Sequence, residues 1–405
     1  MDKFTFDYQK AILAMQLDNR KQMFVMQTKL SVSTGEQISW IRLTRSKNVG
    51  PGTFYQLIRL FGSAACALDN IDELAAKGGS KRKITLTSED DVLTEIDLTE
   101  RYGARLICSC DAAYPQLLMR TPDAPPVITV LGRNDIFNNH PSVAIVGARN
   151  ASLNGSSFAK HLAADLAERN ITIVSGLARG IDTAAHIGAL NNITIAVIAG
   201  GIDHIYPPEN EKLYWQIAGN GAVIAELPIG CPPLARHFPQ RNRIIAGIAH
   251  ALAVIEAAKK SGSLITAEVA RAYARKVFAV PGSPLDERAG GTNYLLKNGA
   301  TLLESSQDII SYMNSLGNSM FETNASYTPP ANTGLPPESE LAQYRKQLQQ
   351  ALSYTPVSMD LILAETAIPF TILNVLVLEL ELAGRLTRSY GNKICLVNMK
   401  DINKI

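Results

Sequence analysis

Two glycine turns that each carry an arginine are the segments of this chain best suited to bind a charged ligand. The first, Gly147-Ala148-Arg149, follows an apolar run at 143–146, and the second, Ser175-Gly176-Leu177-Ala178-Arg179-Gly180, follows an apolar run at 171–174. Glycine at the end of a strand leaves main-chain N–H groups free beside a helix N-terminus, where anions bind. Arginine adds a planar, permanently charged fork that fits phosphate oxygens. The pattern predicts a phosphate-binding site.

A third cluster of candidate phosphate ligands lies near the start of a predicted apolar helix. It contains His237, Phe238, Arg241, Asn242 and Arg243. Cations near a helix N-terminus oppose the helix dipole and cost stability unless an anion lies there. The cluster therefore indicates a second phosphate-facing segment. The alternative is that the arginines form ion pairs with Glu226 or Asp203.

Two smaller features accompany these clusters. Ser261-Gly262-Ser263 opens the next predicted helix and forms another N-terminal anion cradle, with Ser263 as a cap. Asp182 and His186 lie four residues apart, on one face of the helix that follows Arg179. The pair could act as acid and base. We favour a capping role for Asp182 at the arginine turn and a structural role for His186.

A nucleotide cofactor is not indicated by these turns. A dinucleotide-binding sheet needs Gly-x-Gly-x-x-Gly after its first strand, and here Arg149 replaces the second glycine. No Gly-Lys-Ser/Thr phosphate loop occurs in the right context, and none of the five cysteines forms a CxxC pair. We therefore predict no cofactor and no metal site.

The composition is that of a globular protein in a reducing compartment. Of 405 residues, 46% are hydrophobic and 19% charged, with a net charge of +2. Nucleic-acid binding must therefore depend on where the cations cluster. No run reaches the roughly 18 apolar residues that span a bilayer, and the N-terminus lacks the layout of a signal peptide. We expect a cytoplasmic protein without a membrane segment.

Buried strands that mostly end in glycine or proline are the elements expected to position the turns. The strand candidates are residues 104–110, 127–132, 143–146, 171–174, 194–198 (followed by Gly200 and Gly201), 222–225, 251–255 and 277–280. Helical segments such as 156–169 and 263–276 separate them, as parallel strands require. The prediction is an α/β fold with a doubly wound, mainly parallel, extended Rossmann-like sheet. Residues 104–132 are expected to extend its parallel core.

Smaller domains are predicted on both sides of the sheet. Residues 36–103 read as a small helical domain of the SAM or helix-hairpin-helix kind, with Val49-Gly50-Pro51-Gly52 as the hairpin. Contact with a DNA backbone and packing on a neighbouring element are equally favoured for this hairpin. Residues 104–314 hold the sheet, 315–338 read as a linker, and 1–35 form an extension without an assigned function.

The last domain, residues 339–405, combines three predicted helices with a small hairpin, as in a winged-helix domain. In such domains the third helix enters the major groove. Here that helix carries Glu379 and Glu381 and no Lys or Arg before Arg385. Because carboxylates repel phosphates, packing or partner docking is favoured over base reading.

Residues 104–312 resemble the DprA/Smf family of DNA-processing proteins. The resemblance is carried by the two arginine turns with Asp182 and His186, by Gly200-Gly201-Ile202-Asp203 with Tyr206-Pro207, by Phe238 with Arg241-Asn242-Arg243-Ile244-Ile245, by Glu256 with Ser261-Gly262-Ser263, and by Gly291-Thr292-Asn293 with Gly299-Ala300. One departure is Pro207-Pro208-Glu209-Asn210, where no lysine adds charge.

The resemblance implies a homodimeric, non-catalytic protein that binds single-stranded DNA, protects incoming strands during natural transformation and loads the RecA recombinase. The arginines would contact phosphates, with turn amides between them, and Phe238 would stack a base. The implied DNA-binding residues are Gly147, Ala148, Arg149, Ser175, Gly176, Arg179, Gly180, Asp182, Gly200, Gly201, Phe238, Arg241, Asn242, Arg243, Ser261, Gly262 and Ser263.

Two other functions stay open at this point. The chain also resembles the nucleotide phosphoribohydrolases called Lonely Guy proteins, whose Pro-Gly-Gly-x-Gly-Thr-x-x-Glu motif supplies a catalytic glutamate. The equivalent stretch here has Ser261-Gly262-Ser263 before Glu268 and lacks the Pro-Gly-Gly. The third possibility is a nucleotide-sensing module that signals through the C-terminal domain.

Overall fold

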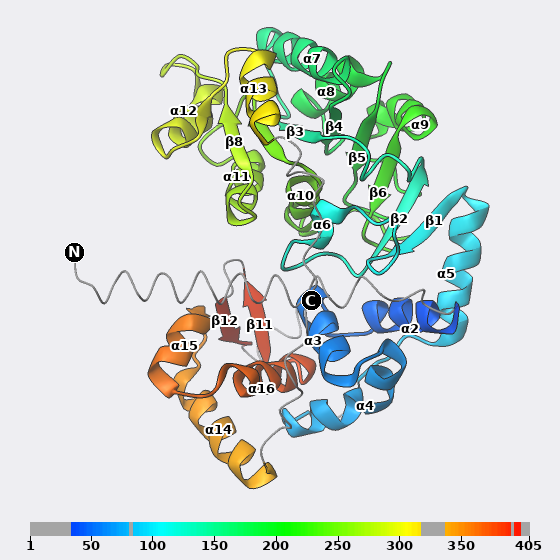
Figure 1. Cartoon of the computed structure of the whole chain (residues 1–405), viewed down its shortest axis with the longest axis vertical. Coiled ribbons are helices and arrows are strands. Elements are labelled where there is room, and N and C mark those ends of the chain that lie inside the picture. Colours follow the sequence, from blue (N-terminus) through cyan, green and yellow to red (C-terminus); the bar gives the residue numbers. More distant parts are fainter. Residues whose placement is uncertain (1–33, 81–83, 317–336, 390–392, 398–405) are drawn as a thin grey trace. The chain divides into compact units, whose positions relative to one another are not determined.

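The computed structural model describes residues 34–80, 84–316, 337–389 and 393–397, which divide into two compact units (Figure 1). One unit is the α/β part and begins at Thr94. The other combines the helical segment before Thr94 with the chain from Pro337 onward. The predicted N-terminal extension and linker lie almost wholly outside the described residues, and the predicted domain boundaries stay predictions.

The described part of the α/β unit contains a nine-stranded sheet with the order β1-β2-β6-β5-β4-β3-β7-β8-β9. Its strands are β1 (Ala104–Cys108), β2 (Val127–Gly132), β3 (Ser142–Val146), β4 (Thr172–Ser175), β5 (Thr194–Val197), β6 (Ala222–Ala225), β7 (Ala251–Val254), β8 (Lys276–Ala279) and β9 (Thr301–Leu302). In this order, all neighbouring strands from β6 through β3 to β9 pair in parallel. The order reverses between β3 and β7, as in a Rossmann sheet. The predicted doubly wound, mainly parallel fold is confirmed.

The first two strands correct one detail of that prediction. β1 pairs with β2 antiparallel, and β2 pairs with β6 antiparallel, so residues 104–132 extend the sheet but not its parallel core. The connection between the two strands holds only the four-residue helix α6 (Gln116–Met119). A parallel crossover needs a longer helix that covers a face of the sheet.

Helices cover both faces of the sheet (Figure 1). They are α7 (Leu153–Ala167), α8 (Ile181–Ala189), α9 (Glu211–Asn220), α10 (His237–Ile248), α11 (Gly262–Ala272), α12 (Gly290–Lys297) and α13 (Ser306–Leu316). Successive residues of a strand point to opposite faces. Val143 and Ile145 therefore pack with α7, α8 and α13, while Ala144 and Val146 pack with α10 and α11. Apolar runs without polar alternation produce these two cores.

The second unit joins the helical segment to a winged-helix domain. Its helices are α2 (Thr34–Arg45), α3 (Pro51–Phe61), α4 (Ala64–Lys77), α14 (Glu338–Ala351), α15 (Met359–Thr366) and α16 (Phe370–Leu382), and α5 (Glu89–Arg101) leads into the α/β unit. Three short strands, β10 (Val357–Ser358), β11 (Leu386–Ser389) and β12 (Lys393–Leu396), pair in the order β10-β12-β11. The predicted wing turn at 390–392 lies outside the described residues.

Helix α16, the third helix of the winged-helix domain, is buried along most of its length. Its Glu379 accepts two hydrogen bonds from Arg345, at 2.7 and 2.8 Å. Its Glu381 accepts one from Arg388, at 2.7 Å, and one from the Thr53 hydroxyl of α3, at 3.4 Å. The packing role predicted for this helix from its two glutamates is confirmed.

The glycine hairpin before α3 also packs within this unit. The side-chain amide of Asn48, just before the hairpin, donates to the carbonyl of Leu382 at the end of α16. A Cβ placed on Gly52 would meet the Arg388 side chain at 4.0 Å. Of the two roles open for the hairpin, the structure shows the packing contact.

Helices α7 and α8 approach each other closely at Gly188, where a Cβ would lie 2.1 Å from the carbonyl oxygen of Lys160. We expect Gly188→Ala to lower the free energy of unfolding by about 1–3 kcal/mol, because the backbones must separate. The control is Gly219→Ala in α9, where the new methyl group meets no atom within 4 Å. It should raise stability by up to about 1 kcal/mol. Equal effects in urea unfolding would contradict this account of the packing.

Candidate nucleic-acid interface

The two arginine turns lie in contact at one edge of the sheet. They follow β3 and β4, which are parallel neighbours, so their carboxyl ends meet at the same edge. The Ile181 amide donates to the Ala148 carbonyl at 3.2 Å. Gly180 has φ 76°, and a Cβ on it would lie 2.3 Å from that same carbonyl oxygen. Glycine is thus required at 180 for the second turn to rest on the first.

A small hollow opens beside these turns, between the ends of β4 and β5 and the start of α10. It is lined by Gly176, Ala178, Ile198, Ala199, Gly200, His204, Tyr206, Pro233, Phe238 and Arg241. Four of these residues, Gly176, Gly200, Phe238 and Arg241, belong to the set expected from the sequence. The structure therefore joins the second glycine turn to the α10 cluster.

Phe238 is half-buried and lies close to two cations. The guanidinium carbon of Arg149 lies 5.0 Å from the ring centroid, and that of Arg241 lies 6.0 Å from it. Tyr206 meets the ring edge-on, with centroids 5.7 Å apart. An aromatic ring with guanidinium groups nearby is suited to stack a base while the cations hold phosphates.

Arg241 is a buried cation at the wall of the hollow, with 6% of its surface exposed. Its Nη1 donates to the Val197 carbonyl at 2.8 Å, whereas Nε has no hydrogen-bond partner among the described residues. Burial lowers the pKa of Arg241 to about 10, although the carboxylate of Asp182 opposes the shift. The side chain is therefore charged at neutral pH and incompletely paired. A buried, incompletely paired cation favours an anionic ligand.

Asp182 holds the second turn in place. Its Oδ2 accepts hydrogen bonds from the amides of Gly176, at 3.1 Å, and Ala178, at 3.3 Å. Burial raises the pKa of Asp182, and the Arg241 guanidinium opposes that rise. The capping role favoured from the sequence is confirmed. Because the Gly176 amide already donates to this carboxylate, it is not free to contact phosphate as expected from the sequence.

Arg179 is exposed and forms an ion pair with Glu209. Glu209 stands in the segment where the sequence departs from the family pattern. Exposed pairs of this kind contribute little to stability. The pair nevertheless offsets the positive charge of Arg179, whereas Arg149 and Arg241 lie against the Phe238 ring.

Arg243 does not reach the hollow. It is buried and donates to the carboxylate of Glu226 and the carbonyl of Asp123. Residues two apart on a helix point in nearly opposite directions, so Arg241 and Arg243 cannot share one face of α10. We correct the expectation that Arg243 contacts phosphate. The alternative of an ion pair with Glu226 is the one observed.

Several other expected ligands are bonded within the protein and do not line the hollow. The hydroxyl of Ser175 donates to Ile145, that of Ser263 donates to Gly147, and the Asn242 amide donates to Gly262, each to a backbone carbonyl. The Ser261 hydroxyl caps α11 by accepting from the Ser263 amide, and the Gly201 amide donates to the Cys231 carbonyl. These residues shape the loops around the site.

His204 and Tyr206 are lining residues that sequence reasoning did not place in the site. In the sequence, Tyr206 stood out only as part of a Tyr-Pro motif shared with the family. A stronger signal was its position in the loop after β5, since such loops end at the same edge as the arginine turns. Glu268, the candidate catalytic glutamate of the enzyme alternative, is exposed on α11 and does not line the hollow.

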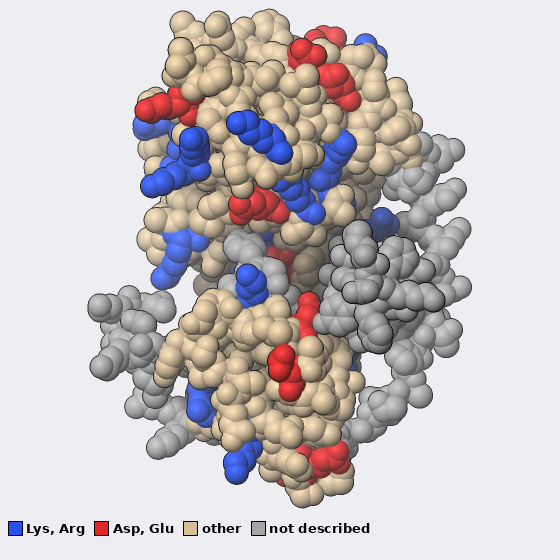
Figure 2. All heavy atoms as spheres, turned by 90° about the vertical axis from the view of Figure 1, so that its left-hand side faces the viewer, with Lys and Arg blue, Asp and Glu red and all other residues tan. Residues whose placement is uncertain are grey.

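The surface of the α/β unit carries charges of both signs. On the face shown in Figure 2, the Lys and Arg side chains of the α/β unit lie beside Asp and Glu side chains. Within the described residues, no group of three or more His, Cys, Asp and Glu is placed to hold a metal ion. The same part of the chain contains no helix long and apolar enough to cross a bilayer.

The sheet order and the arginine turns define a Rossmann-like protein that carries arginines in the loops after its parallel strands. Comparison with known families agrees. Residues 105–314 match the family described as DNA recombination-mediator protein A, residues 34–97 match the DprA-like N-terminal HHH domain, and residues 329–392 match the DprA winged helix domain. The chain belongs to the DprA/Smf family of DNA-processing proteins.

Individual relatives extend over most of the chain. Protein Smf of Synechocystis sp. is 32% identical over 397 residues, which cover 89% of this chain and 98% of that protein. The X-ray structure of DprA from Streptococcus pneumoniae has a TM-score of 0.58 and 31% identity, covering 69% of this chain and 98% of that one. A DprA structure from Helicobacter pylori, described as showing its single-stranded DNA binding mode, has a TM-score of 0.48 and 28% identity and covers 52% and 96%.

His186, next to this site, allows a test of burial through the pH dependence of stability. Thr194 donates its hydroxyl to Ile173, so His186 donates Nδ1–H to that hydroxyl, at 2.7 Å. Burial, reinforced by the Arg241 charge, lowers the pKa of His186 to about 3. Below about pH 6.5 the imidazole is therefore protonated in the unfolded chain but stays neutral in the folded chain. The free energy of unfolding falls on acidification as a result.

We expect His186→Gln to reduce that loss by about 1.4 kcal/mol per pH unit between roughly pH 6.5 and pH 4. The measurement is urea unfolding of the variant and the natural chain across this range. Burial also lowers the pKa of His250, to about 4, but this contribution is common to both proteins. Parallel pH profiles would contradict the proposed burial of a neutral imidazole.

Proposed function

We propose that this chain is a non-catalytic single-stranded DNA-binding protein that protects incoming DNA and loads the RecA recombinase during natural transformation. The observation that supports it most directly is the placement of Arg149 and Arg241 around the Phe238 ring. Phosphate contact and base stacking are the two terms by which proteins hold unpaired strands without reading their sequence.

The proposal favours single strands over duplexes for a geometric reason. A base can stack on Phe238 only if it is unpaired and turned away from a partner strand. The guanidinium groups beside the ring can then reach the adjacent phosphates. Binding needs no bond to break, so the site performs its task without a nucleophile or general base.

The recombination part of the proposal draws on family membership. The family description names a DNA recombination mediator, a role that requires handing a bound strand to a recombinase. We further propose that the protein acts as a cytoplasmic homodimer, since two copies would offer a strand a longer track. The phosphate contacts should be lost as salt rises, because each contact releases counterions.

The Arg149→Ala substitution tests the phosphate contact. We expect it to weaken binding of a single-stranded oligonucleotide by about tenfold, to the same degree for every sequence, and to reduce the slope of log K against log salt by about 0.7. RecA assembly on the same strand should slow in parallel. The measurement is a fluorescence titration with single- and double-stranded oligonucleotides at several salt concentrations.

The matched control is Arg133→Ala. Arg133 is exposed and pairs with Asp135. It follows β2, which runs antiparallel to β6, so Arg133 lies at the edge of the sheet opposite to the arginine turns. It should leave affinity and slope unchanged. An Arg149→Ala protein with the affinity and slope of the natural chain would count against this site, and equal affinity for duplexes would count against the preference for single strands.

The Phe238→Ala substitution tests stacking separately from charge. We expect a loss of about 1–3 kcal/mol of binding free energy with no change in the salt slope, because an uncharged ring releases no counterions. Phe238→Tyr keeps an aromatic face and should retain the affinity. If the alanine variant instead lowers the slope, or if both variants bind alike, Phe238 does not stack a base.

A further inference from the structure

The sheet has a standard ligand position that is separate from the hollow. In doubly wound sheets, ligands bind in the crevice outside the carboxyl ends of the strands, at the point where the strand order reverses. In this chain that point lies between β3 and β7. The helix that follows β3 is α7, and its N-terminus is where a nucleotide phosphate would lie.

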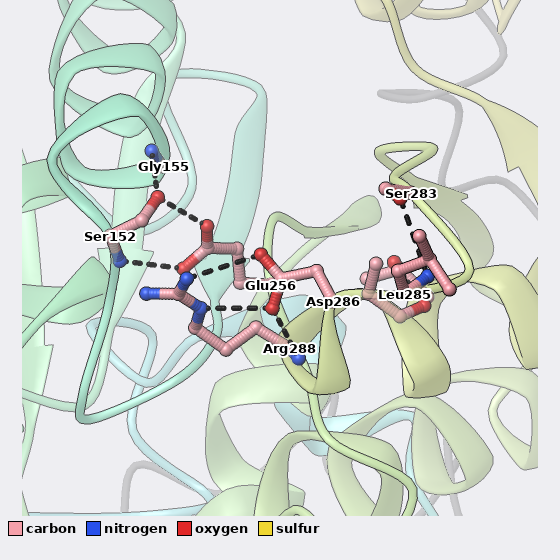
Figure 3. Close-up of polar contacts among 9 residues, drawn as sticks. Ser152, Gly155, Glu256, Ser283, Leu285, Asp286 and Arg288 are labelled. Atoms are coloured by element: carbon pink, nitrogen blue, oxygen red, sulfur yellow. Dashed lines mark hydrogen bonds and ion pairs between the residues drawn. The ribbon is translucent and has the colours of Figure 1, made fainter.

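A carboxylate of the protein already occupies the N-terminus of α7. Glu256, two residues beyond the end of β7, accepts hydrogen bonds from the amide of Ser152 at 2.9 Å and from its hydroxyl at 2.6 Å. The same hydroxyl accepts the amide of Gly155 at 2.9 Å, so it caps the helix. Figure 3 shows these contacts, which join Glu256 to Ser152 and Ser152 to Gly155.

The glycine at position 155 makes room for this carboxylate. A Cβ placed there would lie 2.5 Å from the carboxyl carbon of Glu256 and 2.6 Å from its Oε1. Any side chain at 155 would therefore collide with the glutamate. The first turn of α7 is shaped for the carboxylate, and Arg288, drawn next to it in Figure 3, pairs with Asp286 at 3.1 Å.

A carboxylate and a phosphate compete for the same place here. Both seek the positive end of the helix dipole and the first N–H groups of the helix. Glu256 takes the Ser152 donors and adds a negative charge that repels a second anion. The hollow with Phe238 lies instead at the ends of β4 and β5, so the ligand position is displaced from the reversal point by at least one strand.

We propose that Glu256 is a specificity-determining residue, which fills the phosphate position of the Rossmann-like sheet and excludes free nucleotide phosphates from the crevice between β3 and β7. The proposal rests on the proposed function in one respect, namely that the ligand of the protein is a polynucleotide. The Glu256 carboxylate would explain why a sheet with the Rossmann strand order does not bind free nucleotides at its usual ligand position.

The test is calorimetric titration of the full chain with inorganic pyrophosphate. The arginines of the hollow can bind this probe in every variant, so the measured quantity is the number of sites. We expect Glu256→Ala to bind one more pyrophosphate per chain than the natural protein. Glu256→Ser, whose hydroxyl can bond to the freed Ser152 groups, should behave alike and replaces the alanine variant if that one does not fold.

Two controls separate occupancy from charge. Glu256→Gln removes the charge but still fills the space, and it should gain no site. Glu168→Ala removes a glutamate from the exposed C-terminal end of the same helix and should also gain none. A Glu256→Ala protein without an additional site, or an additional site in Glu168→Ala, would overturn the proposal. Single-stranded DNA binding by the natural chain, measured in parallel, tests the proposed function independently.

Discussion

The contact of Gly180 with the backbone of the first arginine turn is the constraint on which the site depends. Only a residue without a Cβ lets the second turn rest on the Ala148 carbonyl. That contact fixes where α8 begins and holds Arg149 beside the strand ends. The guanidinium group then lies over the ring of Phe238, a residue of α10 that follows Arg149 by about 90 residues in the chain. A steric requirement at one glycine thus brings a distant aromatic ring and a cation together.

Buried charge is the second feature that makes this edge suited to an anion. Burial lowers the pKa of Arg241 and raises that of Asp182, so the fold disfavours both ionised forms. The amides of Gly176 and Ala178 and the carbonyl of Val197 offset part of that cost. The solvation of the cation has already been removed, so a phosphate need not displace its water. This is preorganisation in the electrostatic sense.

Local patterns predicted most of the fold, because apolar runs closed by glycine mark buried parallel strands wherever they occur. They did not predict the direction of β1 and β2, which depends on pairing with β6, a strand about 90 residues away. In the site, Arg149 and Phe238 follow from residue type and position. The burial of Arg243 depends on the helical phase of α10, and the neutralisation of Arg179 by Glu209 depends on a distant loop. The carboxylates that pair with Arg243 and Arg179 lie 17 and 30 residues away, beyond the reach of local patterns.

Two features act together on the crevice between β3 and β7. Arg149 stands where the second glycine of a dinucleotide fingerprint would allow the backbone to approach a pyrophosphate. A residue with a Cβ at this position hinders that approach, and Glu256 adds a negative charge and occupies the donors of Ser152. The arginine turns away from the crevice towards Phe238, so the same substitution that removes one ligand position supplies a cation to the other.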